Sequence, residues 1–376
     1  MTMADPAPFT SSDAPAFASR DLASHRARAV RLDEMQLRKA MARRHGLGDM
    51  RAAVLYGESL FQVAPSAALA LQLARFHRQC RSYQQARAVL AKASAHWPDH
   101  PDMLRLQAEI AMLAKDNDRA AALWLRVLQI GPVAGVYPIL QAIGCLRRCG
   151  DEAQVHALVT AYAPVLRATY PTEALTLLQT GLTGLPHDLP GLSMITGNNG
   201  TGKTTVGHVL QAIGFTIVDA DTEIAVFRRQ NHCSPVRFDL TGGDPKAEAQ
   251  THWDWPDDRF HAACAVARRA DRPAIVIGGF GRVVSRHIAV ADHVFHLTVP
   301  THVIAKRLEK RNSPAHRPGT QGYAAALRRN ARAAVPEYPA TILMANRPVW
   351  QICSDILQTL GHLPKGRPDA QAHQII

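Results

Sequence analysis

The sequence LSMITGNNGTGKTT (Leu192–Thr205) carries the strongest structural signal in the chain. Its residues Gly197–Thr204 match the pattern G-x-x-x-x-G-K-[ST] without a mismatch, and an apolar run precedes them. Glycines let the backbone curl so that successive N–H groups point at phosphate oxygens, and a helix that starts there adds its own unpaired N–H groups. We therefore expect a phosphate-binding loop between a strand and a helix.

Each position of this loop has an expected role toward a nucleoside triphosphate. Lys203 can reach the β- and γ-phosphates, Thr204 can ligate Mg²⁺, and Thr205 is placed to contact the α-phosphate. The remaining nucleotide-binding positions are Gly197, Asn198, Asn199, Gly200, Thr201 and Gly202. A chance glycine-rich turn is the alternative.

Beyond residue 191, short apolar runs alternate with amphipathic segments. The runs are Leu192–Thr196, Thr216–Ala220, Ala274–Ile277, His293–Val299 and Thr341–Ala345. Such alternation predicts an α/β domain with a parallel sheet that helices cover on both faces.

Two acids, Asp219 and Asp221, end the second of these runs. Residues two apart in a strand face the same side, so both carboxylates are expected in the crevice where open α/β sheets bind ligands. One could hold magnesium, and the other could accept a hydrogen bond or proton from an attacking hydroxyl. Solvated acids in a strand-end turn are the alternative.

The first half repeats with a period of 34 residues. The repeat is carried by Ala52, Ala86 and Ala120, by Tyr56, Leu90 and Trp124, and by Pro98 and Pro132. Residues 48–165 resemble tetratricopeptide repeats, pairs of helices in which a small residue permits close approach and proline ends the second helix. The resemblance implies an all-α domain with a protein-binding face. An irregular helical bundle is the alternative.

The stretch GNNGTGKTTVGHVLQAIGFTIVDADTEI (Gly197–Ile224) is similar to the openings of shikimate kinase and dephospho-CoA kinase. Residues 191–361 thus resemble P-loop small-molecule kinases of the nucleoside-monophosphate-kinase-like group. The resemblance implies ATP and Mg²⁺ as cofactors and transfer of the γ-phosphoryl group to a small hydroxylated acceptor. It assigns Lys203 and Thr204 to ATP and magnesium, Asp219 to magnesium, and Asp221 to the substrate.

The run AIVIGGFGRV (Ala274–Val283) ends in Gly278-Gly279 instead of an acid, which argues against motor-type and transporter-type ATPases. It resembles the glycine-rich strand end of shikimate kinase, where backbone contacts the substrate, so Gly278, Gly279 and Arg282 are candidate substrate-binding residues. Phe280 departs from that pattern, and a purely structural turn is the alternative.

Residues 306–332 hold eight Lys or Arg and one Glu, and resemble the lid of these kinases. Arginine makes bidentate contacts with phosphate, so Arg311 is a candidate catalytic residue and Arg317 a candidate substrate-binding residue. Arg307 and Lys310 are expected to be solvated. The resemblance also places Asn346 and Arg347 beside the base.

The composition limits partners without selecting one. Lys and Arg outnumber Asp and Glu, 43 to 31, for a formal charge of +12, which attracts any polyanion. The basic run in residues 20–45 has two interpretations, an arm that binds nucleic acid or the solvated face of a first helix. The solvated helix face is the favoured interpretation. The six cysteines form no CxxC pair, which favours a reducing cytoplasm, and no apolar run reaches membrane-spanning length.

The expected organisation is a disordered leader (1–20), a tetratricopeptide-like helical domain (21–183), a linker (184–191), a P-loop kinase-like α/β domain (192–362) and a flexible tail (363–376). The linker GLPHDLPG contains two prolines and two glycines, which disfavour a continuous helix. The favoured function is a small-molecule kinase with a protein-docking module. A nucleotide-regulated scaffold or slow ATPase is the alternative, and a nucleic-acid end kinase is disfavoured.

Overall fold

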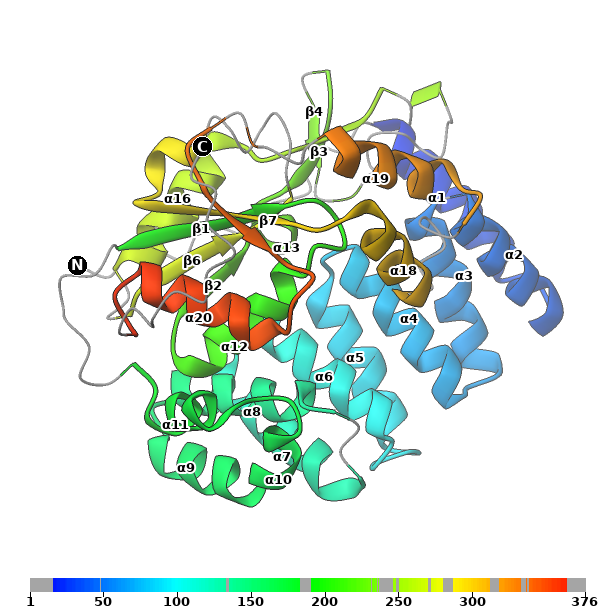
Figure 1. Ribbon diagram of the computed structural model, residues 1–376. Coiled ribbons are helices and arrows are strands. Elements are labelled where there is room, and N and C mark those ends of the chain that lie inside the picture. The colour runs from blue at the N-terminus through cyan, green and yellow to red at the C-terminus, as the bar shows by residue number, and fades with distance from the viewer. Residues whose placement is uncertain are drawn as a thin grey trace, which may run out of the picture. The chain divides into compact units, whose positions relative to one another are not determined.

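The computed structural model describes residues 16–47, 49–132, 135–182, 191–230, 232–234, 236, 246–247, 250–269, 272–279, 287–311, 318–332, 336 and 338–363. The N-terminal part is helical, and the C-terminal part contains a five-stranded parallel sheet (Figure 1). The chain divides into two compact units, Met1–Asp116 with Val226–Asp254, and Asn117–Ala225 with Trp255–Ile376. None of the helices among the described residues has the length and apolar character needed to cross a membrane.

The first unit is built mainly of successive helices. They are α1 (Ala16–Ala29), α2 (Glu34–Gly46), α3 (Met50–Val63), α4 (Ala67–Gln79), α5 (Tyr83–Ser94) and α6 (Pro101–Leu113). Residues 16–20, expected in the leader, are therefore helical. Ala52 and Ala86 are fully buried, as the repeat predicts for positions where helices approach closely.

The same unit includes a small antiparallel sheet in the order β4-β3-β5. Its strands are β3 (Val226–Arg229), β4 (His232–Ser234) and β5 (His252–Asp254). Arg228 Nε donates to Asp254 Oδ2 at 2.7 Å, and the rings of Phe227 and Trp253 meet edge to face. This sheet lies in the sequence between the second and third strands of the parallel sheet.

The second unit begins with further helices of the repeating region. They are α7 (Asn117–Ile130), α8 (Tyr137–Arg148), α9 (Glu152–Ala161), α10 (Ala163–Arg167) and α11 (Thr172–Thr180). Helices α3, α5, α7 and α9 start at residues 50, 83, 117 and 152, so the helix starts follow the period seen in the sequence. The side chains of Asp49 and Asp151, three periods apart, cap α3 and α9.

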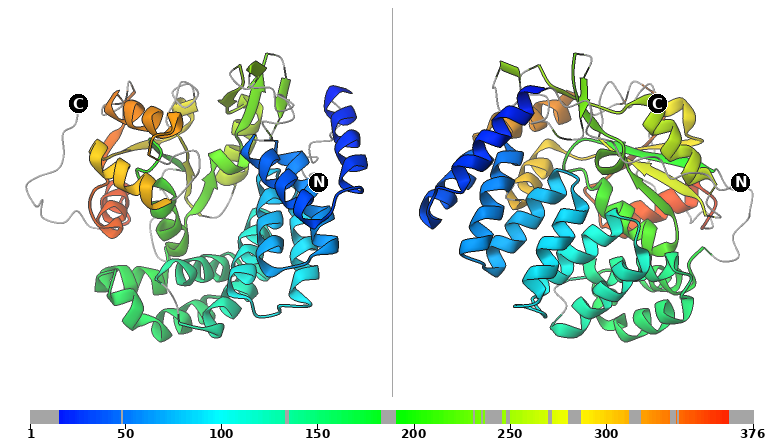
Figure 2. Two further views of the ribbon diagram at one scale, coloured as in Figure 1. Left: turned by 90° about the vertical axis from the view of Figure 1, so that its right-hand side faces the viewer. Right: turned by 180° about the vertical axis from the view of Figure 1, so that it is seen from behind.

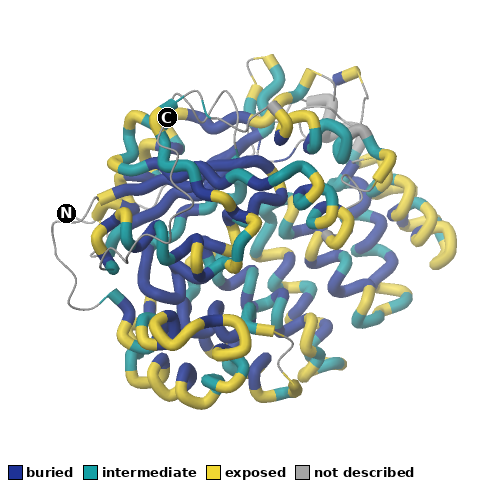
Figure 3. Tube along the Cα trace, viewed as in Figure 1, coloured by how far each residue is buried: buried dark blue, intermediate teal, exposed yellow. Residues whose placement is uncertain are grey.

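The parallel sheet has the order β2-β6-β1-β7-β8, and every pair in it is parallel. Its strands are β1 (Leu192–Gly197), β2 (Thr216–Asp219), β6 (Ala274–Ile277), β7 (His293–Thr298) and β8 (Thr341–Met344). All five predicted strands are confirmed. Every residue of the central strand β1 is buried, and Figure 3 shows the strands at the centre of this sheet as largely buried.

Helices cover both faces of the sheet. The connecting elements are α12 (Lys203–Ile213), α13 (Ala220–Glu223), α16 (Asp257–Arg268), the 3₁₀ turn η2 (Ile288–Val290), α18 (Thr301–Arg311), α19 (Gln321–Arg332) and α20 (Val349–Thr359). Phe260 and Cys264 of α16 share a core with Leu192 and Met194 of β1. Gly207 of α12 packs against Ile277 of β6 on the other face of the sheet. Both faces are covered because successive side chains of a strand point to opposite faces.

Helix α8 joins the helical part of this unit to the α/β part. Its residues Pro138–Arg147 are all buried, because α7, α9 and α12 pack around it. The ring of Tyr137 lies 5.1 Å from that of His208 on α12, and Gly144 approaches Gln211 closely. In the views of Figures 1 and 2, α8–α11 lie below the parallel sheet, and α8 and α11 contact α12.

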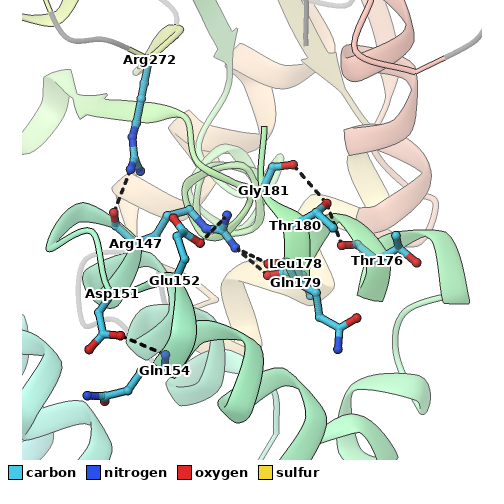
Figure 4. Close-up of polar contacts among 10 residues, drawn as sticks. All are labelled: Arg147, Asp151, Glu152, Gln154, Thr176, Leu178, Gln179, Thr180, Gly181 and Arg272. Carbon is cyan, nitrogen blue, oxygen red and sulfur yellow. Dashed lines mark hydrogen bonds and ion pairs between the residues drawn. The ribbon is translucent and has the colours of Figure 1, made fainter. Parts of the chain in front are cut away.

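The buried side chain of Arg147 joins α8 to α11 and α9 (Figure 4). Its Nη2 donates to Leu178 O at 2.7 Å and to Gln179 O at 3.4 Å, two carbonyls in the last turn of α11. Its Nη1 pairs with Glu152 Oε2 at 3.1 Å. Arg272, just before β6, donates to the carbonyl of Arg147 at 2.9 Å.

Of the expected linker, only Gly191 falls within the described residues, and of the expected tail only Leu363 does.

Candidate functional site

The glycine-rich loop connects β1 to α12 at the carboxyl end of the central strand. Gly197 has φ +143°, and a Cβ there would lie 2.5 Å from Leu297 O and 2.9 Å from Thr201 Oγ1. Gly200 and Gly202 also have positive φ, at +89° and +103°. A side chain at position 197 therefore cannot be accommodated without moving β7, and the loop depends on glycine there.

The loop surrounds a buried cation. Lys203 Nζ donates to Gly197 O at 2.8 Å and to Asn198 O at 3.1 Å, and its side chain is buried. The hydroxyl of Thr201 donates to Asn198 O at 2.9 Å, which closes the turn. A positive charge thus lies within the curve of the backbone, where the sequence places it.

Helix α12 begins directly at the loop. Its first intrahelical bond runs from Val206 N to Gly202 O at 3.0 Å, and no side chain caps its N-terminus. The N–H groups of Lys203, Thr204 and Thr205 therefore precede the helical hydrogen-bond ladder. Thr204 and Thr205 are exposed. A helix N-terminus of this kind, with a lysine behind it, attracts an anion.

Arg307 on α18 braces the loop from outside. Its Nη1 donates to Gly200 O and Thr201 O, both at 3.0 Å, and its Nη2 donates to Ala345 O at 2.7 Å. Burial lowers the pKa of its guanidinium. The prediction that Arg307 is solvated is wrong, because the helix turns it inward beside the buried Ile304 and Leu308.

A cavity of about 320 Å³ opens beside the loop. It is lined by Gly200, Thr201, Gly202, Thr205, Val206, Arg307, Lys310, Ala345, Arg347, Val349 and Ile352. Arg347, which the resemblance places beside the base, is held by Asp355 through an ion pair and donates from Nε to Met344 O at 3.0 Å. The cavity falls in the size range of small-ligand sites.

The two acids are arranged differently from the expectation. Asp219 ends β2, but Asp221 belongs to the short helix α13, so the premise that both are strand residues is wrong. The cause is local, since Asp219 Oδ1 accepts from Asp221 N at 3.1 Å and from Thr222 N at 3.3 Å and starts a helical turn. Burial, and next the charge of Asp221, raise the pKa of Asp219 to about 6.

The structure brings Asp221 and the glycine pair after β6 together. Gly279 N donates to Asp221 Oδ1 at 3.3 Å, and a Cβ at Gly279 would lie 3.5 Å from both carboxylate oxygens. At Gly278 a Cβ would lie 2.3 Å from the buried ring of Trp255. The packing of Trp255 therefore requires glycine at position 278, while Gly279 lies against the carboxylate of Asp221.

The remaining candidate residues are described in part or not at all. Arg311 is the last residue of α18, and its side chain lies outside the described residues. Arg282 and Arg317 lie entirely outside them.

The strand order places these features around the loop. Strands β6 and β2 lie on one side of β1 and lead to Gly278-Gly279 and the acids, whereas β7 and β8 lie on the other side and lead to the cavity. All of these strands are parallel, so their carboxyl ends share one edge. A ligand held at the loop would have the cavity on one side and the acids on the other.

No protein-family model matches this chain, and the search of curated proteins found no match.

Proposed function

We propose that this protein is a phosphotransferase that moves the γ-phosphoryl group of ATP to a small hydroxylated acceptor. The observation that carries the proposal is the Gly197–Thr204 loop, in which a buried lysine and an uncapped helix N-terminus lie at the carboxyl end of a central parallel strand. This combination of backbone N–H groups and a cation suits the terminal phosphates of a nucleotide. The cavity lined by Arg307 and Arg347 would accept the base and ribose.

The residues at the loop take distinct roles in this proposal. The backbone from Gly197 to Gly202 binds the phosphates, and Lys203 exchanges its contacts with Gly197 O and Asn198 O for β- and γ-phosphate oxygens. The exposed Thr205 contacts the α-phosphate. Since little covalent chemistry is asked of the protein, positioning and charge neutralisation are the main contributions.

Thr204 and Asp219 fit a magnesium ion. Their hydroxyl and carboxylate oxygens are hard ligands of the kind Mg²⁺ prefers. Among the described residues, the capping bonds of Asp219 go to Oδ1, which leaves Oδ2 for a ligand. When bound, Mg²⁺ supplies charge neutralisation at the β- and γ-phosphates.

The acceptor is proposed to bind where α13 meets the end of β6. Asp221 would accept the hydrogen bond or proton of the attacking hydroxyl, and Gly279 would let the acceptor approach the backbone. By resemblance, Gly278 and Arg282 would contribute to this site, Arg317 would contact the acceptor or its phosphate, and Arg311 would stabilise the transferring group.

The test is ATP consumption with labelled ATP against a panel of hydroxylated metabolites, nucleotides and oligonucleotides. We expect one acceptor to raise turnover well above background, and Asp221→Ala to abolish that turnover while ATP binding survives. Asp258→Ala, an exposed acid on α16, serves as the matched control and should keep full activity. Turnover that survives in Asp221→Ala would contradict the assigned role.

A second candidate function is a nucleotide-regulated scaffold that binds ATP, hydrolyses it slowly and signals to a protein partner through the helical repeats. The packing of α8 on α12, the helix that starts at the loop, favours it, because nucleotide binding and the helical part share one compact unit. If no acceptor stimulates turnover but ATP alters binding of a protein partner, this function is supported over the kinase.

A further inference from the structure

Arg307 contacts the backbone of two separate segments at once. Two of its hydrogen bonds go to the glycine-rich loop, at Gly200 O and Thr201 O, and the third goes to Ala345 O, between β8 and α20. The planar guanidinium reaches the two segments because its donors lie on two separate nitrogens at fixed positions, Nη1 and Nη2, whereas the three donors of a lysine share one nitrogen. The two segments that line the cavity are therefore fastened to one side chain.

These bonds also determine which way the peptide groups of the loop point. In a trans peptide the C=O and N–H point in opposite directions. With Thr201 O held on Arg307, the N–H of Gly202 faces away from α18. With Gly200 O held as well, the N–H of Thr201 turns to Asn198 O, 3.3 Å away, inside the loop's own turn.

The loop has the freedom to lose this arrangement. Gly200 and Gly202 flank the two peptide groups, and glycine populates both signs of φ with little difference in energy. A peptide flip at 201–202 would replace an N–H donor by a carbonyl oxygen in front of a bound anion. That exchange turns an attraction into a repulsion.

We infer that Arg307 is a positioning residue, which orients the peptide groups of the Gly197–Thr204 loop for phosphate before the nucleotide arrives. The inference rests on the proposed function for its ligand, but the order it gives to the loop exists without one. Arg307 binds the carbonyls of the loop, so its effect on the amides that would contact phosphate passes through the backbone.

Lys306 provides a matched control. It precedes Arg307 on the same helix and carries the same charge, but it is exposed and is not among the residues that line the cavity. If positive charge on α18 were all that mattered, Lys306→Ala and Arg307→Ala would have similar effects. If orientation of the loop matters, only Arg307→Ala has a large effect.

The experiment uses the full chain and three variants, Arg307→Ala, Arg307→Lys and Lys306→Ala. Calorimetry with MgATP should show affinity reduced at least tenfold in Arg307→Ala and nearly as much in Arg307→Lys, because a single ammonium nitrogen cannot take the places of both Nη1 and Nη2. Lys306→Ala should stay within about threefold of the parent. Methylguanidinium added at millimolar concentration should restore part of the affinity of Arg307→Ala and should not affect the parent.

A second measurement needs no nucleotide. Amide hydrogen exchange in residues 197–206 should be faster in Arg307→Ala than in the parent or in Lys306→Ala, while exchange in α16 stays the same. The inference is overturned if that exchange is unchanged, or if Lys306→Ala weakens MgATP binding as much as Arg307→Ala does. If the parent binds no nucleotide at all, the proposed function fails, and the exchange measurement still decides the role of Arg307.

Discussion

Replacing Arg147 with methionine tests how α8 is held against α11 and α9 within the helical part of the second unit. Methionine keeps an unbranched apolar stem but removes the guanidinium that bonds Leu178 O and Gln179 O and pairs with Glu152. Since Leu178 is fully buried, its carbonyl would lose a charged donor with little compensation from water.

The size of the effect follows from these contacts. A hydrogen bond from a charged donor contributes about 1.5–3 kcal/mol. The pair with Glu152, whose side chain is 43% exposed, adds less than about 1 kcal/mol. We expect a total loss of about 2–4 kcal/mol, or a fall in Tm of roughly 5–12 °C for a unit of this size.

Stability is measured by urea unfolding. Because the two units need not unfold together, the stability of the second unit is also measured by amide hydrogen exchange in α8 and α11. Exchange in α3, which belongs to the other unit, is the internal reference. Arg167→Met, at an exposed position on α10, is the matched control and should change stability by less than about 0.5 kcal/mol. A loss in Arg147→Met no larger than in the control would refute the view that the Arg147 side chain holds α8 against α11 and α9.

Two other substitutions probe the loop and the helix behind it. Gly197→Ala should lose at least about 2 kcal/mol of stability and most nucleotide affinity, because its Cβ would lie 2.5 Å from Leu297 O. The control Gly46→Ala has open space around the new Cβ and should be neutral or slightly stabilising in thermal unfolding. Equal stability changes in the two variants would contradict the geometry. Burial lowers the pKa of His208 to about 4, so the folded unit takes up its proton less readily than the unfolded chain, and stability should fall as pH drops from about 6.5 toward 4. His208→Gln should flatten that decline in urea titrations at a series of pH values, and an unchanged slope would show that His208 does not cause it.

The sheet was predictable because its strands are short apolar runs with clear ends. The central strand β1 is buried throughout, and Leu192–Thr196 is uncharged and mainly apolar, with two small polar residues, Ser193 and Thr196. The glycine-rich loop was predictable for a related reason, since a backbone with positive φ at Gly197, Gly200 and Gly202 restricts the residue type at each position.

The errors arose where local hydrogen bonds or distant contacts decide the outcome. Asp219 and Asp221 look like alternating strand residues, but the carboxylate of Asp219 caps a helical turn that includes Asp221. Arg307 looks like one basic residue among many on α18, and its partners Gly200 and Ala345 lie far away in the sequence. No periodicity on one helix can reveal such contacts.

The packing of α8 on α12 was missed, although the sequence held a signal. YPILQAIGCLRR (Tyr137–Arg148) has apolar residues around most of the helix, which indicates burial on more than one side. A helix in an open repeat array needs only one buried stripe, so the additional apolar face required a second partner.

The most direct test of the central claim is titration calorimetry of the full chain with ATP, with and without Mg²⁺, alongside Lys203→Ala. We expect magnesium-dependent binding by the parent and a loss of about 10- to 150-fold in the variant, which corresponds to a charged hydrogen bond of about 1.5–3 kcal/mol. Binding of equal strength by Lys203→Ala, or no binding of ATP or GTP by the parent, would contradict a phosphate site at the Gly197–Thr204 loop.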